Sequence, residues 1–294
     1  MVKNIIIGQK SFVTKSILKY LKNPIVFSAN ELTKKKIQEQ THNYKKINLV
    51  FNNFYPSKLL NDLNHNNYND LCNLSLSKIS LLFETIPSSK INKIIYTSSA
   101  AIYRLIGNIS NQKSDPYNRE LYSSFKLAAE KLILNYSCSK NKDYFIMRLF
   151  NTYGDSQDKF SFIEKIIRAK KEKTRLTLIN EGLSLRDFIH LDDIGKIYTI
   201  FLNKKLNKGI YDIGSGKGFL IKDLVNVAKI PINKLIKKNK IEEIKDSIAD
   251  SEKLLLQIGD FNFKDLNKYI KNKLKLKNNF KSQTFSPIKN NNLS

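Results

Sequence analysis

The sequence is poor in cysteine and contains no long hydrophobic run. Only Cys72 and Cys138 occur among 294 residues, so no disulfide framework is expected, and this usage fits a protein of the reducing cytoplasm. No apolar run approaches the roughly 20 residues that a membrane-spanning helix needs. The first apolar run, residues 4–7, is too short for a secretory signal peptide and predicts a first β-strand. We expect no metal site, because metal-ligating residues form no cluster along the sequence.

Acidic residues are also scarce, with 26 Asp and Glu against 51 Lys and Arg and a formal charge of +25. Such an excess is compatible with a polyanionic partner, such as nucleic acid or an anionic membrane. It is equally compatible with lysine filling ordinary solvated positions. The lysines are spread along the whole chain, without an arginine-rich block or a nucleic-acid-binding motif, which favours the second interpretation. We therefore predict no nucleic-acid or membrane partner, although the positive field would attract a nucleotide diphosphate.

Short apolar segments alternate with amphipathic ones through the first half of the chain, which is typical of βαβ units. The predicted strands are residues 4–7, 25–27, 49–51, 94–97 and 145–149. The predicted helices between them are residues 12–21, 31–40, 71–86 and 121–136. Because βαβ crossovers are right-handed, the fold class predicted is α/β, a Rossmann-like doubly wound parallel sheet.

The pattern changes after Gly154, where shorter strands and helices follow one another less regularly. We predict helices near residues 160–172, from residue 192, and near 221–228, 251–255 and 263–274, with strands at 176–179 and 209–213. The domains predicted are a Rossmann-like domain at 1–155 with return segments near 183–205, and a smaller, mostly substrate-binding C-terminal domain at 156–276. Residues 277–294 are rich in Lys, Asn and Ser and predict a flexible basic tail.

Tyr122 and Lys126 are separated by four residues in a predicted helix, so their side chains share one face. An ammonium group near a phenol stabilises the phenolate and lowers a pKa that is ordinarily about 10. Tyr122 is thus a candidate general acid and base for a sugar hydroxyl or carbonyl. The same spacing arises by chance in many helices. Ser99 adds weight, because it follows a predicted strand where ligands bind in open α/β sheets.

Four motifs occur in a fixed order: Ser-Ser-Ala-Ala-Ile-Tyr from residue 98, Tyr-x-x-x-Lys-x-x-x-Glu from 122, Arg-Leu-Phe-Asn-x-Tyr-Gly from 148 and Arg-Asp-Phe-Ile-His-x-Asp-Asp-Ile from 186. As an ordered set they resemble the NAD-dependent epimerase/dehydratase family, the extended short-chain dehydrogenases/reductases. The resemblance extends from about Lys3 to Gly259. It implies an NAD- or NADP-dependent enzyme acting on a nucleotide-activated sugar, and a homodimer.

The resemblance also implies roles for individual residues. Ser99 would hydrogen-bond the reacting sugar oxygen, with its neighbour Ser98 as the less favoured alternative. Tyr122 would transfer the proton, and Lys126 would bind the nicotinamide ribose and lower the tyrosine pKa. A structural Ser-Ser turn is the competing interpretation for the two serines.

Asn151 and Arg186 resemble the family's contacts to the nucleotide diphosphate of the substrate. The planar fork of arginine suits this role because it can bind two phosphate oxygens at once. The alternatives are that Asn151 caps a strand end and that Arg186 pairs with Asp187 or Asp193. Asp192 and Asp193 are expected to cap the following helix. His190 is expected to be a packing residue.

The phosphate loop departs from the family pattern. The family usually has Gly-x-x-Gly-x-x-Gly after the first strand, whereas residues 8–14 retain Gly8 alone. Ser11 could cap the following helix and keep its N–H groups directed at an anion. Thr14 is larger and β-branched, so the helix must shift or the cofactor must bind differently. The resemblance assigns cofactor contacts to Gly8, Ser11, Phe12 and Val13.

The cofactor and the reaction remain open at several points. Ser28 stands where an acidic reader of the 2′-hydroxyl is expected, and lysines at 34–36 would tolerate the 2′-phosphate of NADP. The short interval from residue 28 to 49 suggests that one strand–turn unit is trimmed. The pair Ala100-Ala101 replaces the Asp-Glu typical of the family's dehydratases, which argues against elimination. Hydride transfer at C4 by an epimerase is predicted, with a 4-ketosugar reductase or a non-catalytic member as alternatives.

Overall fold

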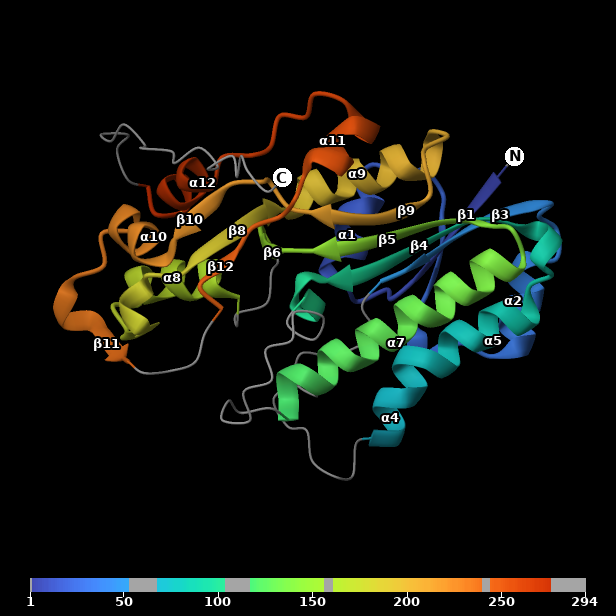
Figure 1. Cartoon of the computed structure of the whole chain (residues 1–294), viewed down its shortest axis with the longest axis horizontal. Coiled ribbons are helices and arrows are strands. Elements are labelled where there is room, and N and C mark those ends of the chain that lie inside the picture. Colours follow the sequence, from blue (N-terminus) through green and yellow to red (C-terminus); the bar gives the residue numbers. More distant parts are fainter. Residues whose placement is uncertain (1, 53–67, 104–116, 156–160, 240–243, 276–294) are drawn as a thin grey trace, which may run out of the picture. The chain divides into compact units, whose positions relative to one another are not determined.

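The computed structural model describes residues 2–52, 68–103, 117–155, 161–239 and 244–275 (Figure 1). The predicted basic tail at 277–294 lies outside the described residues. The chain forms two compact units. Unit 1 comprises Met1–Leu149, Leu191–Ile213 and Glu252–Phe261, and unit 2 comprises Phe150–His190, Gly214–Ser251 and the described part of the segment from Asn262.

Unit 1 is built on a six-stranded sheet with the order β2-β1-β3-β4-β5-β9, in which all neighbouring strands are parallel. The strands are β1 (Val2–Ile7), β2 (Ile25–Phe27), β3 (Lys46–Phe51), β4 (Ile91–Ser99), β5 (Asp143–Leu149) and β9 (Gly209–Ile213). The order reverses between β1 and β3, which is where open α/β sheets bind ligands. The five strands predicted in the first half of the chain are all present.

Helices cover both faces of this sheet (Figure 1). On one face lie α2 (Lys34–Thr41), α4 (Tyr68–Cys72), α5 (Lys78–Thr85) and α7 (Tyr117–Ser139), and on the other α1 (Phe12–Leu18), α9 (Leu191–Asn203) and α11 (Glu252–Ile258). The helix predicted at 71–86 is divided by a π-helical turn at Asn73–Ser77. It ends at Ile86, in an extended conformation, because the residue before Pro87 disfavours helical geometry.

The sheet core is made of Ile, Val and Phe side chains that alternate between the two faces. Ile5 and Ile7 belong to the buried cluster that includes Ile79 and Ile133 of the helices on one face. On the other face, a buried lysine of the sheet binds the end of α9. Lys93 of β4 donates from Nζ to the carbonyl oxygens of Phe201 at 2.9 Å and of Leu202 at 3.3 Å. An ammonium group at this position satisfies the last carbonyls of α9.

Unit 2 has smaller sheets arranged around β8 (Leu185–His190). Its remaining elements are β6 (Asn151–Tyr153), α8 (Phe162–Lys171), β7 (Leu176–Ile179), β10 (Gly218–Leu220), α10 (Ile221–Val227), β11 (Leu235–Lys238), β12 (Asp246–Ser247) and α12 (Leu266–Lys273). β8 pairs with β6 and β12 in parallel and with β10 antiparallel. In the part of the chain that the structure describes, no helix is long and apolar enough to span a membrane.

Candidate active site

Ser99, Tyr122 and Lys126 come together at the carboxyl end of β4 in unit 1. The Ser99 hydroxyl is hydrogen-bonded to Tyr122. The Lys126 ammonium lies 5.8 Å from the centre of the Tyr122 ring, and donates to the carbonyl oxygen of Thr97 at 2.7 Å. The helical spacing of Tyr122 and Lys126 on α7 therefore brings both groups to the strand end that carries Ser99.

A short 3₁₀ turn, Ala100–Ile102, fixes the direction of the Ser99 side chain. Ser99 is its N-cap, and the Ser99 Oγ accepts a hydrogen bond from the Ala101 amide at 3.2 Å. The hydroxyl of Ser123 donates to the Ala101 carbonyl at 3.2 Å. These two bonds join the turn to α7, so Ser99 is held in place relative to Tyr122.

The two serines predicted as alternatives are placed differently. Successive residues of a strand point to opposite faces, so Ser98 and Ser99 diverge. Ser98 is buried, and its Oγ has no hydrogen-bond partner among the described residues. Ser99 is the one bonded to Tyr122, which makes it the better candidate for contact with a substrate oxygen.

Burial dominates the electrostatics of this site. It raises the pKa of Tyr122 to about 12, and the hydrogen bond from Ser99 only partly opposes this. Burial also lowers the pKa of Lys126 to about 7, although the negative charge of Glu130 opposes this shift. We predicted a lowered tyrosine pKa from the nearby lysine, but in the chain alone the pKa of Tyr122 is raised. Removing water from a phenolate costs more free energy than these neighbours return.

The remaining glycine of the phosphate loop has a strict steric role. Gly8 has φ of +111°, and a Cβ on it would lie 2.1 Å from the backbone oxygen of Asn52. The Ser11 hydroxyl accepts from the Val13 amide at 3.2 Å, so the prediction that Ser11 caps α1 is confirmed. Phe12 and Val13 form the first turn of this helix.

Thr14 is accommodated through hydrogen bonds of its hydroxyl. The Thr14 Oγ1 donates to the Gly8 carbonyl at 2.7 Å and accepts from the Asn52 amide at 2.8 Å. Asn52 in turn accepts from the Thr97 hydroxyl at 2.5 Å, and Thr97 also contacts the hydroxyl of Tyr198 at 2.8 Å. A buried network therefore connects the phosphate loop to β4, directly beside the carbonyl that holds Lys126.

The sequence interpretation missed Asn52 and Thr97. A signal was available, since each is a polar residue at or near the end of a hydrophobic strand. The carboxyl ends of adjacent parallel strands meet at the same edge of a sheet. What the sequence does not contain is the pairing of β3 with β4 through Phe51 and Tyr96, which brings the two polar side chains together.

Ser28 directly follows β2 and is the N-cap of a 3₁₀ turn, Ala29–Glu31. Of the nearby lysines, Lys36 forms an exposed ion pair with Glu31 at 3.0 Å. The carboxylate of Glu31, which lies close to the end of β2, is thus paired with the Lys36 ammonium.

The predicted substrate residues Asn151 and Arg186 lie in unit 2. The Asn151 side chain donates to the carbonyl of Asp187 at 2.9 Å, and Arg186 donates to the carbonyls of Leu185 at 2.7 Å and Lys245 at 3.2 Å. The Asp187 carboxylate accepts bonds from Ser215, Gly216 and Ala249. Strand alternation directs Arg186 and Asp187 to opposite faces of β8, which disfavours the ion pair considered from the sequence.

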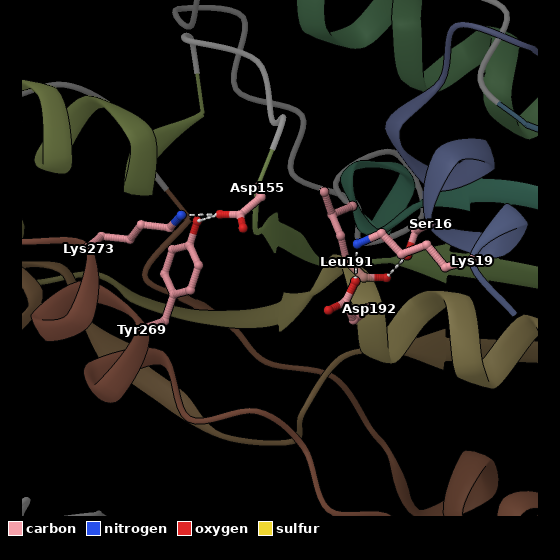
Figure 2. A network of polar contacts seen from close by, with 7 residues as sticks. All are labelled: Ser16, Lys19, Asp155, Leu191, Asp192, Tyr269 and Lys273. Carbon is pink, nitrogen blue, oxygen red and sulfur yellow. Dashed lines mark hydrogen bonds and ion pairs between the residues drawn. The ribbon is translucent and has the colours of Figure 1, made fainter.

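Figure 2 shows two further polar groups, one in each unit. In unit 1, Lys19 pairs with Asp192 at 2.6 Å, and Ser16 donates to the Leu191 carbonyl. Asp192 and Asp193 lie in the first turn of α9 rather than at its cap. The prediction that these aspartates cap the helix is therefore wrong, because both lie inside its first turn, where negative charge is favourable because of the helix dipole.

In unit 2, α12 carries a second Tyr-x-x-x-Lys spacing, Tyr269 and Lys273. Both side chains bind the carboxylate of Asp155, Tyr269 at 3.2 Å (Figure 2). The ring of His190 packs edge-on against Tyr153 and Tyr269 at 5.0 and 5.5 Å, which confirms the packing role predicted for it. A Tyr-x-x-x-Lys spacing in a helix is therefore not sufficient by itself to identify a catalytic site. Among the described residues, no group of three or more His, Cys, Asp or Glu could hold a metal ion.

Comparison with known proteins agrees with this geometry. The profile of the NAD-dependent epimerase/dehydratase family matches residues 30–214, more than half of the chain. The chain belongs to this family. Its members are NAD-dependent nucleotide-sugar epimerases and dehydratases. The family and the fold class predicted from the sequence are therefore confirmed, and the cofactor class predicted, NAD or NADP, is that of the family.

Individual relatives are distant. The dTDP-D-glucose 4,6-dehydratase of Dictyostelium discoideum is 31% identical over 164 residues, 52% of this chain and 37% of that protein. The UDP-glucose 4-epimerase of Halalkalibacterium halodurans is 26% identical over 193 residues, 58% of each. The match thus spans between about a third and three fifths of these relatives. The structure of the Thermus thermophilus UDP-glucose 4-epimerase with NAD has a TM-score of 0.67 at 15% identity, covering 87% of this chain and 92% of that one.

Proposed function

We propose that the chain catalyses NAD(P)-dependent hydride transfer at a sugar carbon, C4, of a nucleotide-diphosphate sugar, as an epimerase. The observation that carries the proposal is the hydrogen bond between Ser99 and Tyr122, with the Lys126 ammonium 5.8 Å from the Tyr122 ring. A general acid and base, a second hydrogen-bonding group and a buried cation are the groups that hydride transfer at a hydroxyl-bearing carbon requires.

The residues present fit a nicotinamide dinucleotide. A side chain at Gly8 would meet the backbone at 2.1 Å, so the loop keeps the tight glycine turn that allows close approach of a pyrophosphate, and Ser11 caps the helix behind it. The residues that would hold the cofactor are Gly8, Ser11, Phe12, Val13, Ser28, Tyr122 and Lys126. When bound, the dinucleotide supplies the hydride acceptor or donor.

The protein's own groups would handle the proton. Tyr122 takes the proton of the C4 hydroxyl as the hydride leaves, and returns it when the carbonyl is reduced. Ser99 hydrogen-bonds the same oxygen. Because the pKa of Tyr122 is raised to about 12 in the chain alone, phenolate formation near neutral pH needs a nearby positive charge. The protonated Lys126 ammonium provides that charge when it faces the ring.

Asn151 and Arg186, in unit 2, are proposed to contact the nucleotide diphosphate. Arg186→Ala is expected to weaken binding of a UDP-sugar about tenfold or more, because a charged hydrogen bond contributes about 1.5–3 kcal/mol. Calorimetric titration measures this affinity. The control is Arg168→Ala, which removes an exposed arginine paired with Glu172 on α8. Undiminished affinity in the Arg186 variant would disprove the phosphate contact.

The fate of the cofactor separates the two enzymatic alternatives. An epimerase regenerates the dinucleotide within each turnover, whereas a 4-ketosugar reductase releases it oxidised. The short chain segment between β2 and β3 keeps the reductase in consideration, because such compactness is also typical of the family's reductases. The Ala100-Ala101 pair supplies no acid or base for a dehydratase, which disfavours elimination. We further propose that the protein is a homodimer, and light scattering measures the molar mass that tests this.

The first experiment is calorimetric titration of the folded protein with NAD⁺, NADH, NADP⁺ and NADPH. Binding of one pair is expected, since Ser11 and Thr14 leave the turn at Gly8 in place. It would justify assaying C4 epimerisation of UDP- and dTDP-sugars under that cofactor. Failure of all four to bind would instead favour a non-catalytic member of the family, as the loss of two glycines suggests.

A further inference from the structure

A buried ion pair lies beside Lys126, outside the residues assigned above. Arg148 of β5 donates from Nε to Oε1 of Glu130 at 3.2 Å and from Nη2 to Oε2 at 2.8 Å. Glu130 is 1% exposed and Arg148 8%. Glu130 follows Lys126 by one helical turn on α7, so both side chains are on the same face. Since desolvation cancels much of the attraction within a buried pair, stability alone explains such a pair poorly.

Contacts on the far side hold Arg148 in this geometry. Its guanidinium carbon lies 4.8 Å from the centre of the Tyr103 ring, a favourable cation–π distance. The Tyr103 hydroxyl donates to Asp212 of β9 at 2.5 Å. Tyr103 directly follows the 3₁₀ turn that Ser99 begins. The arginine is thus fixed between Glu130 and the turn that carries the candidate catalytic serine.

We propose that Glu130 and Arg148 are positioning residues that keep Lys126 protonated beside Tyr122. Arg148 holds the buried Glu130 carboxylate through two hydrogen bonds, and the negative charge of Glu130 favours the ammonium form of Lys126. The inference rests on the proposed function, because it assigns a purpose to the charge of Lys126. Without this pair, a buried lysine would lose its proton and could not stabilise a phenolate.

The groups facing Lys126 identify Glu130 as the source of the negative charge. From α7 these are Tyr122 and Glu130; from β4 they are the Tyr96 ring, at 5.0 Å, and the Thr97 carbonyl. In this part of the described structure Glu130 is the carboxylate that acts on the lysine. Tyr122 is neutral at physiological pH because burial raises its pKa. The carbonyl contributes only a dipole.

The test is the pKa of Lys126 in the full-length protein, measured by NMR from the pH dependence of its ¹³Cε shift. The signal is assigned by its absence in Lys126→Met. Glu130→Gln is expected to lower this pKa by about one pH unit or more, since a charge within one helical turn has been removed. Glu172→Gln is the matched control, because it breaks an exposed arginine pair with Arg168 at 3.0 Å, and it should leave the pKa of Lys126 unchanged.

An unchanged Lys126 pKa in Glu130→Gln would overturn the proposal, since a merely structural pair would alter stability and not this titration. If the lone arginine prevents folding, the double variant E130Q/R148M removes both charges, a change that buried pairs often tolerate, and the same fall is expected. In an active enzyme the alkaline limb of kcat should also move to lower pH. A lowered pKa without activity on any nucleotide sugar would refute the proposed function while supporting this inference.

Discussion

Tyr122→Phe is expected to reduce kcat by about 10²–10⁴-fold, the usual contribution of a positioned general acid and base. The phenylalanine keeps the ring that faces Lys126 and removes only the hydroxyl bonded to Ser99. KM should therefore change little. Because phenylalanine has no group that can take or return a proton, raising the pH should not restore turnover.

The matched control is Tyr136→Phe on the same helix. Its hydroxyl is buried without a hydrogen-bond partner among the described residues, and its ring stacks on Phe83 with the centroids 3.8 Å apart. This substitution should leave turnover unchanged and stability equal or slightly higher. The measurement is the steady-state kcat and KM of the wild-type protein, Tyr122→Phe and Tyr136→Phe. Wild-type turnover by Tyr122→Phe would refute the assignment of Tyr122.

Gly8→Ala is expected to abolish dinucleotide binding and to destabilise unit 1 by about 3 kcal/mol or more, through backbone strain and overpacking. The added Cβ would lie 2.1 Å from a backbone oxygen, that of Asn52, and a backbone atom cannot move aside as a flexible side chain can. Displacing Asn52 would also disturb its bonds to Thr14 and Thr97. Denaturant unfolding and calorimetric titration measure the two effects.

Gly259 provides the control for backbone conformation. It too has positive φ, +77°, but nothing lies within 4 Å of a Cβ placed on it. Gly259→Ala should therefore cost only the strain of its backbone angle, about 1 kcal/mol, without affecting dinucleotide binding. Equal destabilisation by both substitutions would show that the contact with Asn52 is unimportant.

Much of unit 1 and its site could be predicted from the sequence because the signals are local. Apolar runs of three to five residues identified β1 to β5, and Pro87 marked the end of α5. Tyr122 and Lys126 share a face whenever their segment is helical, and Ser99 follows a strand whose carboxyl end is a binding edge. Ser11 could be assigned as a helix cap from its position before an apolar segment.

Other features depended on residues far apart in the chain. Thr14 looked too large for the phosphate loop. In the structure its hydroxyl donates to the Gly8 carbonyl and accepts from the Asn52 side chain, and these bonds hold it in the loop. Lys93 binds carbonyls at the end of α9, more than a hundred residues away in the sequence. These side chains satisfy backbone or amide groups that only the folded arrangement brings within reach.

The sequence by itself determined the family, the parallel α/β fold and the candidate trio of Ser99, Tyr122 and Lys126, since each follows from local periodicity and ordered motifs. Only the tertiary structure decided the direction in which the pKa values of Tyr122 and Lys126 shift. Burial raises the pKa of Tyr122 and lowers that of Lys126, the reverse of what helical proximity predicts for the tyrosine. The free energy of removing a charge from water depends on everything packed around it, and no spacing of residues along the chain contains that information.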